Sequence, residues 1–167
     1  LGANPIMCSV IGHDDIGTIF GQLLQKREMT AQGIIESPDR VTTVKTRVIG
    51  GHQHLLRIDH EIIDFLDKQL EGELISRIRE ILDTTKVDAI IFQDYDKGVV
   101  TPTIIESVTR LARDRGIPVI VDPKRRHFHA FKGVTLFKPN LKELKEGLNM
   151  EISHQLEGSL EEAADRI

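Results

Sequence analysis

The chain has 167 residues, of which 40% are hydrophobic and 29% charged, with a formal net charge of −4, which is ordinary for one globular domain with a sizeable core. The acidic balance and an aromatic share of only 4% argue against a protein that binds nucleic acid through its phosphates or by stacking on its bases. One cysteine leaves no disulfide within the chain, which suits the cytoplasm, and the short apolar runs predict no membrane span.

The first elements predicted along the chain are a strand and a helix. The apolar run at residues 6–11 predicts a strand that stops at Gly12. Asp14 or Asp15 is expected to cap a helix that begins near Gly17, because a side-chain oxygen there accepts a hydrogen bond from a free backbone N–H. These aspartates are therefore interpreted as structural.

Residues 42–59 change character and predict a β-hairpin. Two runs of β-branched or alternating residues flank Gly50 and Gly51, and a pair of glycines between such runs is typical of a tight turn. One face of the hairpin is polar and carries Lys45, Arg47, Gln53 and Arg57. A polar face of this kind indicates a lid or an interface. A face that is simply exposed to solvent would explain the same pattern equally well.

From residue 70 onward, amphipathic helices alternate with strands that are apolar throughout. Helices are expected at residues 70–82, at 101–116 and from a capping box at Ser159, and strands at 87–93, 117–123 and 134–140. This alternation predicts a doubly wound α/β fold, in which a mainly parallel sheet has helices on both faces. The hairpin is the one segment outside this plan.

Three successive strands end in polar clusters. Asp94 follows the first strand, residues 122–124 (Asp-Pro-Lys) end the second, and residues 138–140 (Lys-Pro-Asn) end the third. Ligands of an open parallel sheet bind at the carboxyl ends of its strands, so these tips predict a site at one edge. Proline and aspartate also end strands for structural reasons, which remains the alternative for any single tip. His127 and His129 lack the further ligands that a zinc site needs.

The residues at these tips suit phosphate and metal. Asn140 and Glu143, three residues apart across the expected start of a helix, share a face and offer the oxygen ligands that hydrated Mg²⁺ prefers. Lys97 and Lys124 add cations that neutralise phosphate oxygens. Neither G-x-x-x-x-G-K-[ST] nor G-x-G-x-x-G occurs, so a nucleotide bound by these residues has no glycine-rich cradle.

Five segments together resemble the ribokinase-like (PfkB) family of carbohydrate kinases. They are LGANPIMCSVIGHDDIG (1–17), TTVKTRVIGGHQHLLRIDHE (42–61), QDYDKGVVTP (93–102), VIVDPK (119–124) and GVTLFKPNLKEL (133–144). They contain the family's G-x-D-x-x-G, D-Y-x-K-G, D-P-K and K-P-N-x-x-E motifs in order. Each motif is weak alone, but their combination over nearly all of the chain is fairly specific. Within the family the similarity is greatest to kinases of D-glycero-β-D-manno-heptose 7-phosphate, which are often fused to an adenylyltransferase.

The resemblance implies ATP- and Mg²⁺-dependent phosphoryl transfer to a sugar phosphate. The implied acceptor is D-glycero-D-manno-heptose 7-phosphate and the product is the 1,7-bisphosphate, which serves ADP-heptose and lipopolysaccharide core synthesis. It implies a ribokinase-like fold, of which this chain is the central part, and a cytoplasmic homodimer formed through the hairpin lid. It implies neither a nucleic-acid nor a membrane partner. A kinase of another sugar, or a non-catalytic sugar- or nucleotide-binding module, remains an alternative.

The matched motifs also imply roles residue by residue. Contacts to ATP and Mg²⁺ are implied for Asn140, Leu141, Lys142, Glu143 and Lys124, with the metal held by Glu143 and, through water, by Asn140. Contacts to the sugar phosphate are implied for Asp94, Lys97, Gln53 and Arg57.

Two motifs of the family are absent from these residues. One is the N-terminal G-G-x-x-x-N sugar-binding segment, and the other is G-A-G-D, whose aspartate is the family's catalytic base. The catalytic base is therefore unassigned. The 167 residues alone are expected to be inactive, because a positioned base contributes about 10²–10⁴-fold to a rate.

Overall fold

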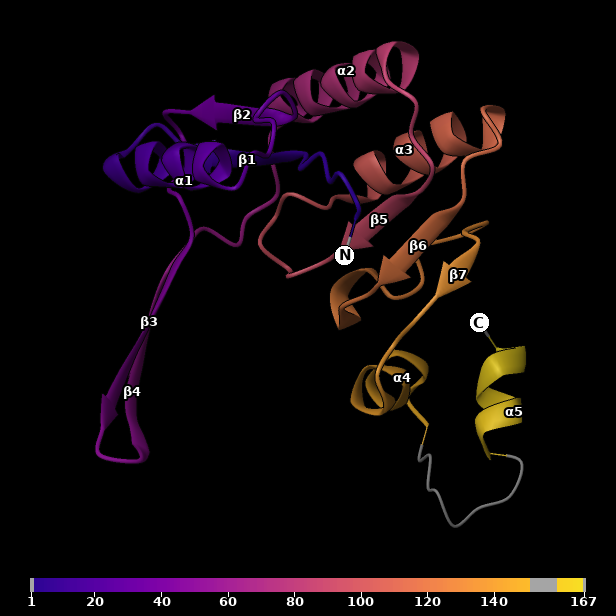
Figure 1. Ribbon diagram of the computed structural model, residues 1–167. Coiled ribbons are helices and arrows are strands. Elements are labelled where there is room, and N and C mark those ends of the chain that lie inside the picture. Colours follow the sequence, from indigo (N-terminus) through magenta and orange to yellow (C-terminus); the bar gives the residue numbers. More distant parts are fainter. Residues whose placement is uncertain (1, 151–158, 167) are drawn as a thin grey trace. The chain divides into compact units, whose positions relative to one another are not determined.

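The computed structural model describes residues 2–150 and 159–166, and the chain divides into two compact units (Figure 1). Unit 1 comprises Leu1–Ile81 with Lys97–Val99, and unit 2 comprises Leu82–Asp96 with Val100–Ile167. Among the described residues, no helix is long and apolar enough to cross a membrane.

Unit 1 contains a short parallel sheet and its helices. Strand β1 (Ser9–Gly12) pairs in parallel with β2 (Ile34–Ser37), and helix α1 (Asp15–Lys26) connects them. Helix α2 (Lys68–Thr84) begins in this unit. The core is formed by buried aliphatic side chains on these elements and in the segment before α2, namely Val10, Ile11, Leu24, Ile35, Leu66, Leu70, Leu74 and Ile81.

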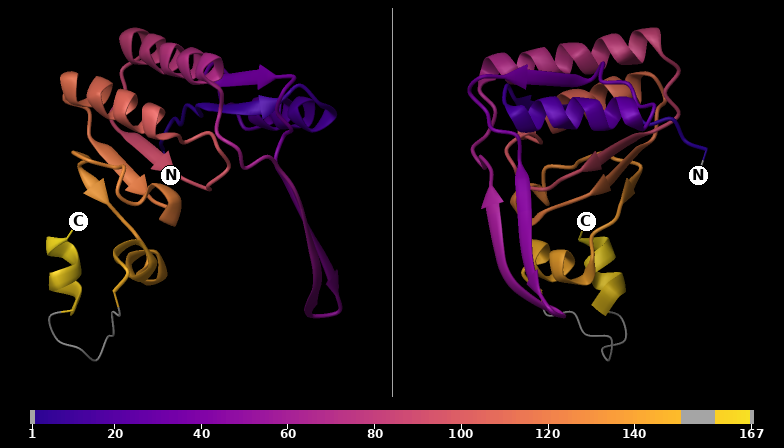
Figure 2. Two further views of the ribbon diagram at one scale, coloured as in Figure 1. Left: turned by 180° about the vertical axis from the view of Figure 1, so that it is seen from behind. Right: turned by 60° about the vertical axis from the view of Figure 1, so that its left-hand side comes forward.

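The hairpin of unit 1 is a separate antiparallel sheet. Strands β3 (Val44–Gly50) and β4 (Gln53–His60) run side by side as a long two-stranded ribbon (Figure 2). The turn falls at Gly51, whose φ of +61° suits glycine, as the sequence predicts. The pairing register shifts between Val48 and Ile49, which marks a β-bulge. Nearly all of the hairpin's side chains are exposed.

Unit 2 contains a parallel sheet in the order β5-β6-β7. The strands are β5 (Ile90–Gln93), β6 (Val119–Asp122) and β7 (Leu136–Phe137), and the helices are α3 (Pro102–Asp114), the 3₁₀ turn η1 (Arg125–His127), α4 (Leu141–Leu148) and α5 (Ser159–Asp165). The apolar face of α3 supplies much of the core, with Ile104, Ile105, Val108, Leu111 and Ala112 all buried. Phe128, Leu144 and Ala163 form a second cluster, against which Phe137 packs.

The predicted α/β architecture is confirmed, but some element bounds are wrong. The first strand begins at Ser9, because its backbone pairing starts only where Ile34 lies opposite. The strand β2 is not anticipated, and β7 has only two residues. The predicted aspartate cap of α1 is confirmed, and it is Asp14 of the two candidates. The capping box predicted at Ser159 involves side chains outside the described part of the chain.

Candidate functional site

The carboxyl ends of the unit 2 strands meet at one edge, as the sequence predicts. In the parallel register Gln93 lies opposite Asp122, and Val121 lies opposite Phe137. The pairing continues past the strands, since Asp94 N–H donates to Asp122 O (3.2 Å) and Lys138 N–H donates to Val121 O (2.9 Å). The polar residues that follow all three strands therefore lie together, where a parallel sheet binds its ligands.

Asp122 is the polar centre of this edge. Its carboxylate accepts hydrogen bonds from Gln93 Nε2 (2.5 Å) and Lys138 Nζ (3.4 Å). These partners, first the Gln93 amide and then the Lys138 ammonium, hold the pKa of Asp122 below its ordinary value. The aspartate is thus an anion whose charge is partly compensated within the edge.

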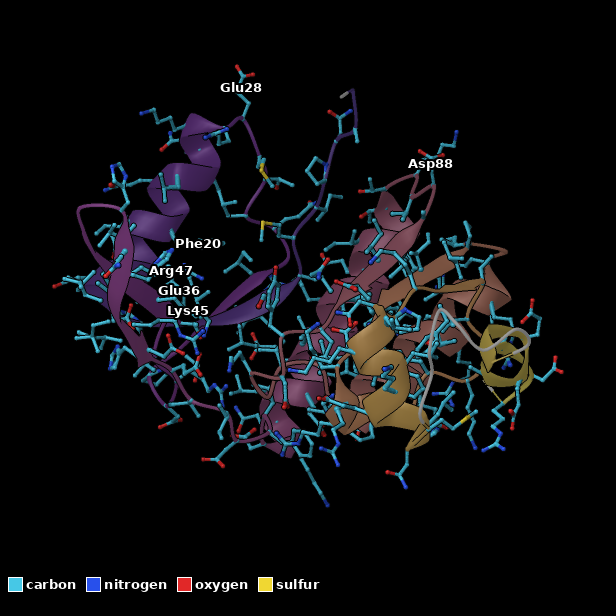
Figure 3. All side chains as sticks on the ribbon, turned by 90° about the horizontal axis from the view of Figure 1, so that it is seen from below. Phe20, Glu28, Glu36, Lys45, Arg47 and Asp88 are labelled. Atoms are coloured by element: carbon cyan, nitrogen blue, oxygen red, sulfur yellow. The ribbon has the colours of Figure 1, made fainter. Side chains whose placement is uncertain are left out.

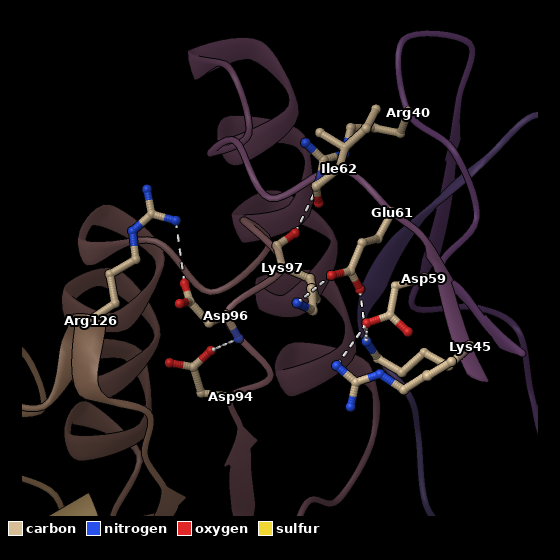
Figure 4. Close-up of polar contacts among 10 residues, drawn as sticks. Arg40, Lys45, Asp59, Glu61, Ile62, Asp94, Asp96, Lys97 and Arg126 are labelled. Carbon is tan, nitrogen blue, oxygen red and sulfur yellow. Dashed lines mark hydrogen bonds and ion pairs between the residues drawn. The ribbon is translucent and has the colours of Figure 1, made fainter. Parts of the chain in front are cut away.

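Asp94 is buried and already has partners on both of its oxygens. Its Oδ1 accepts the backbone N–H of Asp96 (2.7 Å), and its Oδ2 lies 2.9 Å from Nδ1 of His127, whose ring is also buried. Asp96 adopts a positive φ of 55° and forms an ion pair with Arg126 at 3.3 Å. Figure 4 shows Asp94 and Arg126 on either side of Asp96. In this arrangement Asp94 shapes the tip of β5.

Lys124 reaches from the end of β6 to the beginning of α4. Its ammonium forms an ion pair with Glu143, which is the first cause of the raised pKa of Lys124. Glu143 is buried, whereas about a third of the Lys124 side chain is exposed, at 35%. The Lys124 ammonium, paired with the Glu143 carboxylate, is therefore held beside a helix N-terminus, a position that favours anions.

Asn140 and Glu143 form a reciprocal capping box at the start of α4. Asn140 Oδ1 accepts the backbone N–H of Glu143 (2.9 Å), and Glu143 Oε2 accepts that of Asn140 (2.8 Å). The predicted shared face is thus confirmed. Because Lys124 takes the other oxygen of Glu143, this carboxylate fits a cation held through its water shell and not one bound directly. In the part of the chain that is described, no three His, Cys, Asp or Glu side chains gather as a metal site.

The other predicted ATP contacts differ in exposure. Leu141 is half-buried and packs against the cluster of Phe128, Leu144 and Ala163. Lys142 is exposed and lies 3.8 Å from Glu146, one turn further along α4. An exposed pair of this kind is worth little and leaves the Lys142 ammonium open to solvent.

Lys97 belongs to unit 1 and lies at the base of the hairpin. Its ammonium is 2.7 Å from Glu61, which also pairs with Lys45 at 2.9 Å. The hydrogen bond from Lys97, followed by that from Lys45, lowers the pKa of Glu61, and Glu61 raises the pKa of Lys45 in turn. The network continues to Asp59, which lies 3.2 Å from Lys45 (Figure 4). Asp59 also lies 3.1 Å from Arg57.

Arg40 holds the loop that carries Lys97. Its guanidinium donates to the carbonyl oxygens of Asp64 (2.8 Å), Ile62 (3.2 Å) and Lys97 (2.9 Å). The remaining predicted contact, Gln53, is exposed at the start of β4 opposite Gly50. Arg40, Glu61 and the pairing of His127 could not be found from the sequence, because their partners lie 16 or more residues away and no local pattern marks them.

Comparison with known proteins identifies the family. The profile of the pfkB family carbohydrate kinases matches residues 1–167. The chain belongs to this family. Its fold is that of solved family structures: phosphofructokinase-2 from Escherichia coli gives a TM-score of 0.68 at 21% identity, over 95% of this chain and 50% of that one. The 2-dehydro-3-deoxygluconokinase from Thermotoga maritima gives 0.70 at 13% identity, over 99% of this chain and 54% of that one. The predicted ribokinase-like fold is thereby confirmed.

Curated relatives within the family are more similar in sequence. The bifunctional protein HldE of Geobacter metallireducens is 36% identical over 167 residues, which is all of this chain and 33% of the relative. The HldE of Trichlorobacter lovleyi is 37% identical over the same share of each chain. The chain therefore spans about a third of the length of these relatives.

Proposed function

We propose that the protein carrying this chain transfers the terminal phosphoryl group of ATP to a sugar phosphate. The acceptor is D-glycero-D-manno-heptose 7-phosphate and the product is the 1,7-bisphosphate, a step in ADP-heptose and lipopolysaccharide core synthesis. Membership of the carbohydrate kinase family and the similarity to HldE proteins support this proposal. The observation that carries it is the Lys124–Glu143 ion pair, which fixes a cation beside the start of α4 at the carboxyl edge of a parallel sheet.

The unit 2 edge is the proposed nucleotide side. Lys124 and the first backbone N–H groups of α4 bind phosphate oxygens, with Leu141 and Lys142 lining the same turn. Asn140 and Glu143 hold Mg²⁺ through its water shell, and the ion supplies charge neutralisation on the phosphates. Phosphoryl transfer needs mostly positioning and charge stabilisation, which is what a fixed ammonium and oriented N–H groups provide.

The sugar phosphate is bound in this proposal by Asp94, Lys97, Gln53 and Arg57. Lys97 and Arg57 bring positive charge, Gln53 brings an amide, and the hairpin acts as a lid. Asp94 contributes by ordering the tip of β5, since both of its oxygens already have partners. We further propose that the protein works in the cytoplasm as a homodimer joined through the hairpin.

The test uses protein expressed from the complete gene, with ATP, Mg²⁺ and a panel of sugars and sugar phosphates. We expect transfer to the heptose 7-phosphate, and we expect Lys124→Gln to lower the rate by about 10²–10³-fold, as for other charge-stabilising groups. The control is Lys86→Gln, because Lys86 is exposed and precedes the opposite, amino end of β5. Ligand binding without any transfer would instead support a non-catalytic binding module, and transfer to another sugar alone would refute the heptose assignment.

A further inference from the structure

Two arginines face each other across the hairpin. Arg47 on β3 and Arg57 on β4 are register partners in the antiparallel pairing. Directly opposite residues of such a pair lie on the same face with their Cβ atoms about 5 Å apart, and like charges in this position repel. Figure 3 shows Lys45 and Arg47, which are two residues apart on β3 and therefore share this face. The hairpin thus concentrates positive charge on one face, although repulsion between opposite residues of the two strands disfavours it.

The carboxylates nearby compensate only part of this charge. Lys45 has both Asp59 and Glu61 as partners, and Arg57 has Asp59 at 3.1 Å. Among the residues that the structure describes, Arg47 has no carboxylate partner. Arg57 contacts Asp59 through one terminal nitrogen and its side chain is 62% exposed, so most of its N–H donors remain accessible.

Arg47 and Arg57 both line one surface hollow. It has a volume of about 370 Å³, and its other lining residues are His54, Leu55 and Leu56. This volume lies within the range of small-molecule sites, at roughly 300–1,000 Å³. Two forked donors side by side are suited to a phosphate dianion, because guanidinium groups bind phosphate in a bidentate manner.

We propose that Arg47 and Arg57 bind the phosphate group that the sugar-phosphate acceptor already carries. This proposal rests on the proposed function and deepens it by naming the residues that distinguish a phosphorylated acceptor from an unphosphorylated one. In a heptose 7-phosphate the resident phosphate and the reacting hydroxyl lie at opposite ends of the sugar. The hairpin is then a specificity element and not only a cover.

The first experiment measures anion binding without catalysis. The Nε–Hε resonances of Arg47 and Arg57 are followed by NMR during titration with inorganic phosphate at constant ionic strength, in protein from the complete gene. We expect saturable shifts of both resonances, loss of the Arg57 shift in Arg47→Gln, and its partial retention in Arg47→Lys. The control Arg79→Gln removes an exposed arginine of α2 and should change nothing. Absence of saturable shifts in the wild type, or an unchanged Arg57 shift in Arg47→Gln, would overturn the proposal.

The second experiment separates this inference from the proposed function. Arg47→Gln should raise the KM for the heptose 7-phosphate at least tenfold, leave the KM for ATP unchanged, and leave turnover of the unphosphorylated heptose unchanged. Kinetics equal to those of Arg79→Gln would refute the role of the arginine pair alone. If the wild type transfers no phosphoryl group to any sugar phosphate, the proposed function is refuted, and with it the role of Arg47 and Arg57 in binding the acceptor. Whether the two arginines bind an anion is decided separately by the phosphate titration.

Discussion

Asp14 is a residue at which one carboxylate holds two segments of the chain together. Its Oδ1 accepts the backbone N–H of Gly17 (2.7 Å) at the start of α1, and its Oδ2 accepts that of Thr42 (2.8 Å) ahead of the hairpin. These bonds, that from Thr42 first, lower the pKa of Asp14 from its ordinary value of 3.8. Aspartate before a helix is a strong sequence signal, so its capping role was predictable, whereas its bond to Thr42 was not.

The lowered pKa of Asp14 predicts the direction of a pH effect. Because the folded state binds this proton less readily than the unfolded state, the carboxylate stabilises the protein fully above about pH 4 and loses this contribution as the pH falls through the folded pKa. In Asp14→Asn the amide still caps α1 but no longer accepts from Thr42 on its second side. We expect the stability gap between wild type and variant, measured by urea unfolding, to be wide near neutral pH and to close at low pH.

The matched control is Asp15→Asn, which removes an exposed charge from the first turn of α1 while both hydrogen bonds of Asp14 remain. A gap for Asp14→Asn that stays constant from neutral to low pH would show that the carboxylate does not act through these bonds.

His127 and Asp94 form a buried pair between segments 33 residues apart. Removing either partner leaves the other buried with an unmet hydrogen-bonding requirement, at a cost of about 1–3 kcal/mol. We expect His127→Leu and Asp94→Asn each to destabilise the protein, with a coupling energy of roughly 0.5–3 kcal/mol in a double-mutant cycle. Additive effects of the two substitutions on unfolding free energy would contradict the pairing. From the sequence His127 was only a zinc candidate, because nothing in residues 122–129 indicates a partner just after β5.

At the scale of elements, the turn after β5 depends on Gly98. This residue has a φ of +76°, and an added Cβ would lie 1.8 Å from the carbonyl oxygen of Asp64. Its own carbonyl accepts the backbone N–H of Leu66 (3.1 Å), so the turn cannot move without breaking this bond. The glycine of the D-Y-x-K-G motif is thus required by the backbone conformation, in addition to matching the family pattern.

Gly98→Ala should therefore displace the loop that carries Lys97. Gly133 provides the control, because its φ of +71° is similar but nothing lies within 4 Å of an added Cβ. We expect Gly133→Ala to cost about 1 kcal/mol from backbone strain and Gly98→Ala to cost clearly more. Thermal unfolding of the two variants decides this, and equal losses would show that the close approach to Asp64 is unimportant.

The hairpin has a second face, on which apolar side chains are exposed. Val48 lies opposite Leu56, and Ile58 shares their face, with exposed fractions of 41%, 55% and 53%. Two strands with an uncovered apolar face are marginal by themselves, which favours a covering partner. This observation supports the proposed homodimer through the lid, with a second copy of the hairpin as the partner.

Val48→Lys should weaken that dimer by at least tenfold in sedimentation equilibrium of protein from the complete gene, because pairing would bury an uncompensated charge. The control Ile19→Lys places the same charge at an exposed apolar position of α1 (48% exposed) and should leave association unchanged. A wild-type monomer at micromolar concentration would refute the dimer.

Much of the element order could be predicted because it depends on local signals. Proline and threonine at the start of α3 and the two glycines at the hairpin turn specify their elements within a few residues. The strand β2 could not be predicted, since its short run Ile34–Ser37 becomes a strand only through pairing with β1. The convergence of the unit 2 tips was predictable from the parallel topology, but the partners of their side chains were not.

At the scale of the whole molecule, the predicted site residues belong to two units. Lys124, Asn140 and Glu143 lie at the unit 2 edge, whereas Lys97 and the hairpin residues lie in unit 1. In each group, ion pairs already hold a lysine ammonium in place before any ligand binds. Asp94, which the proposal places with the sugar phosphate, lies in unit 2, so the two proposed sets of residues do not coincide with the two units.

The most direct test of this account is ³¹P NMR of protein from the complete gene with ATP, Mg²⁺ and D-glycero-D-manno-heptose 7-phosphate. We expect loss of the terminal phosphate resonance of ATP and the appearance of a second phosphate on the sugar, at C1. An unchanged heptose 7-phosphate under conditions in which another sugar is phosphorylated would contradict the substrate. ATP left intact with every sugar and sugar phosphate would contradict the central claim that the protein is a sugar-phosphate kinase.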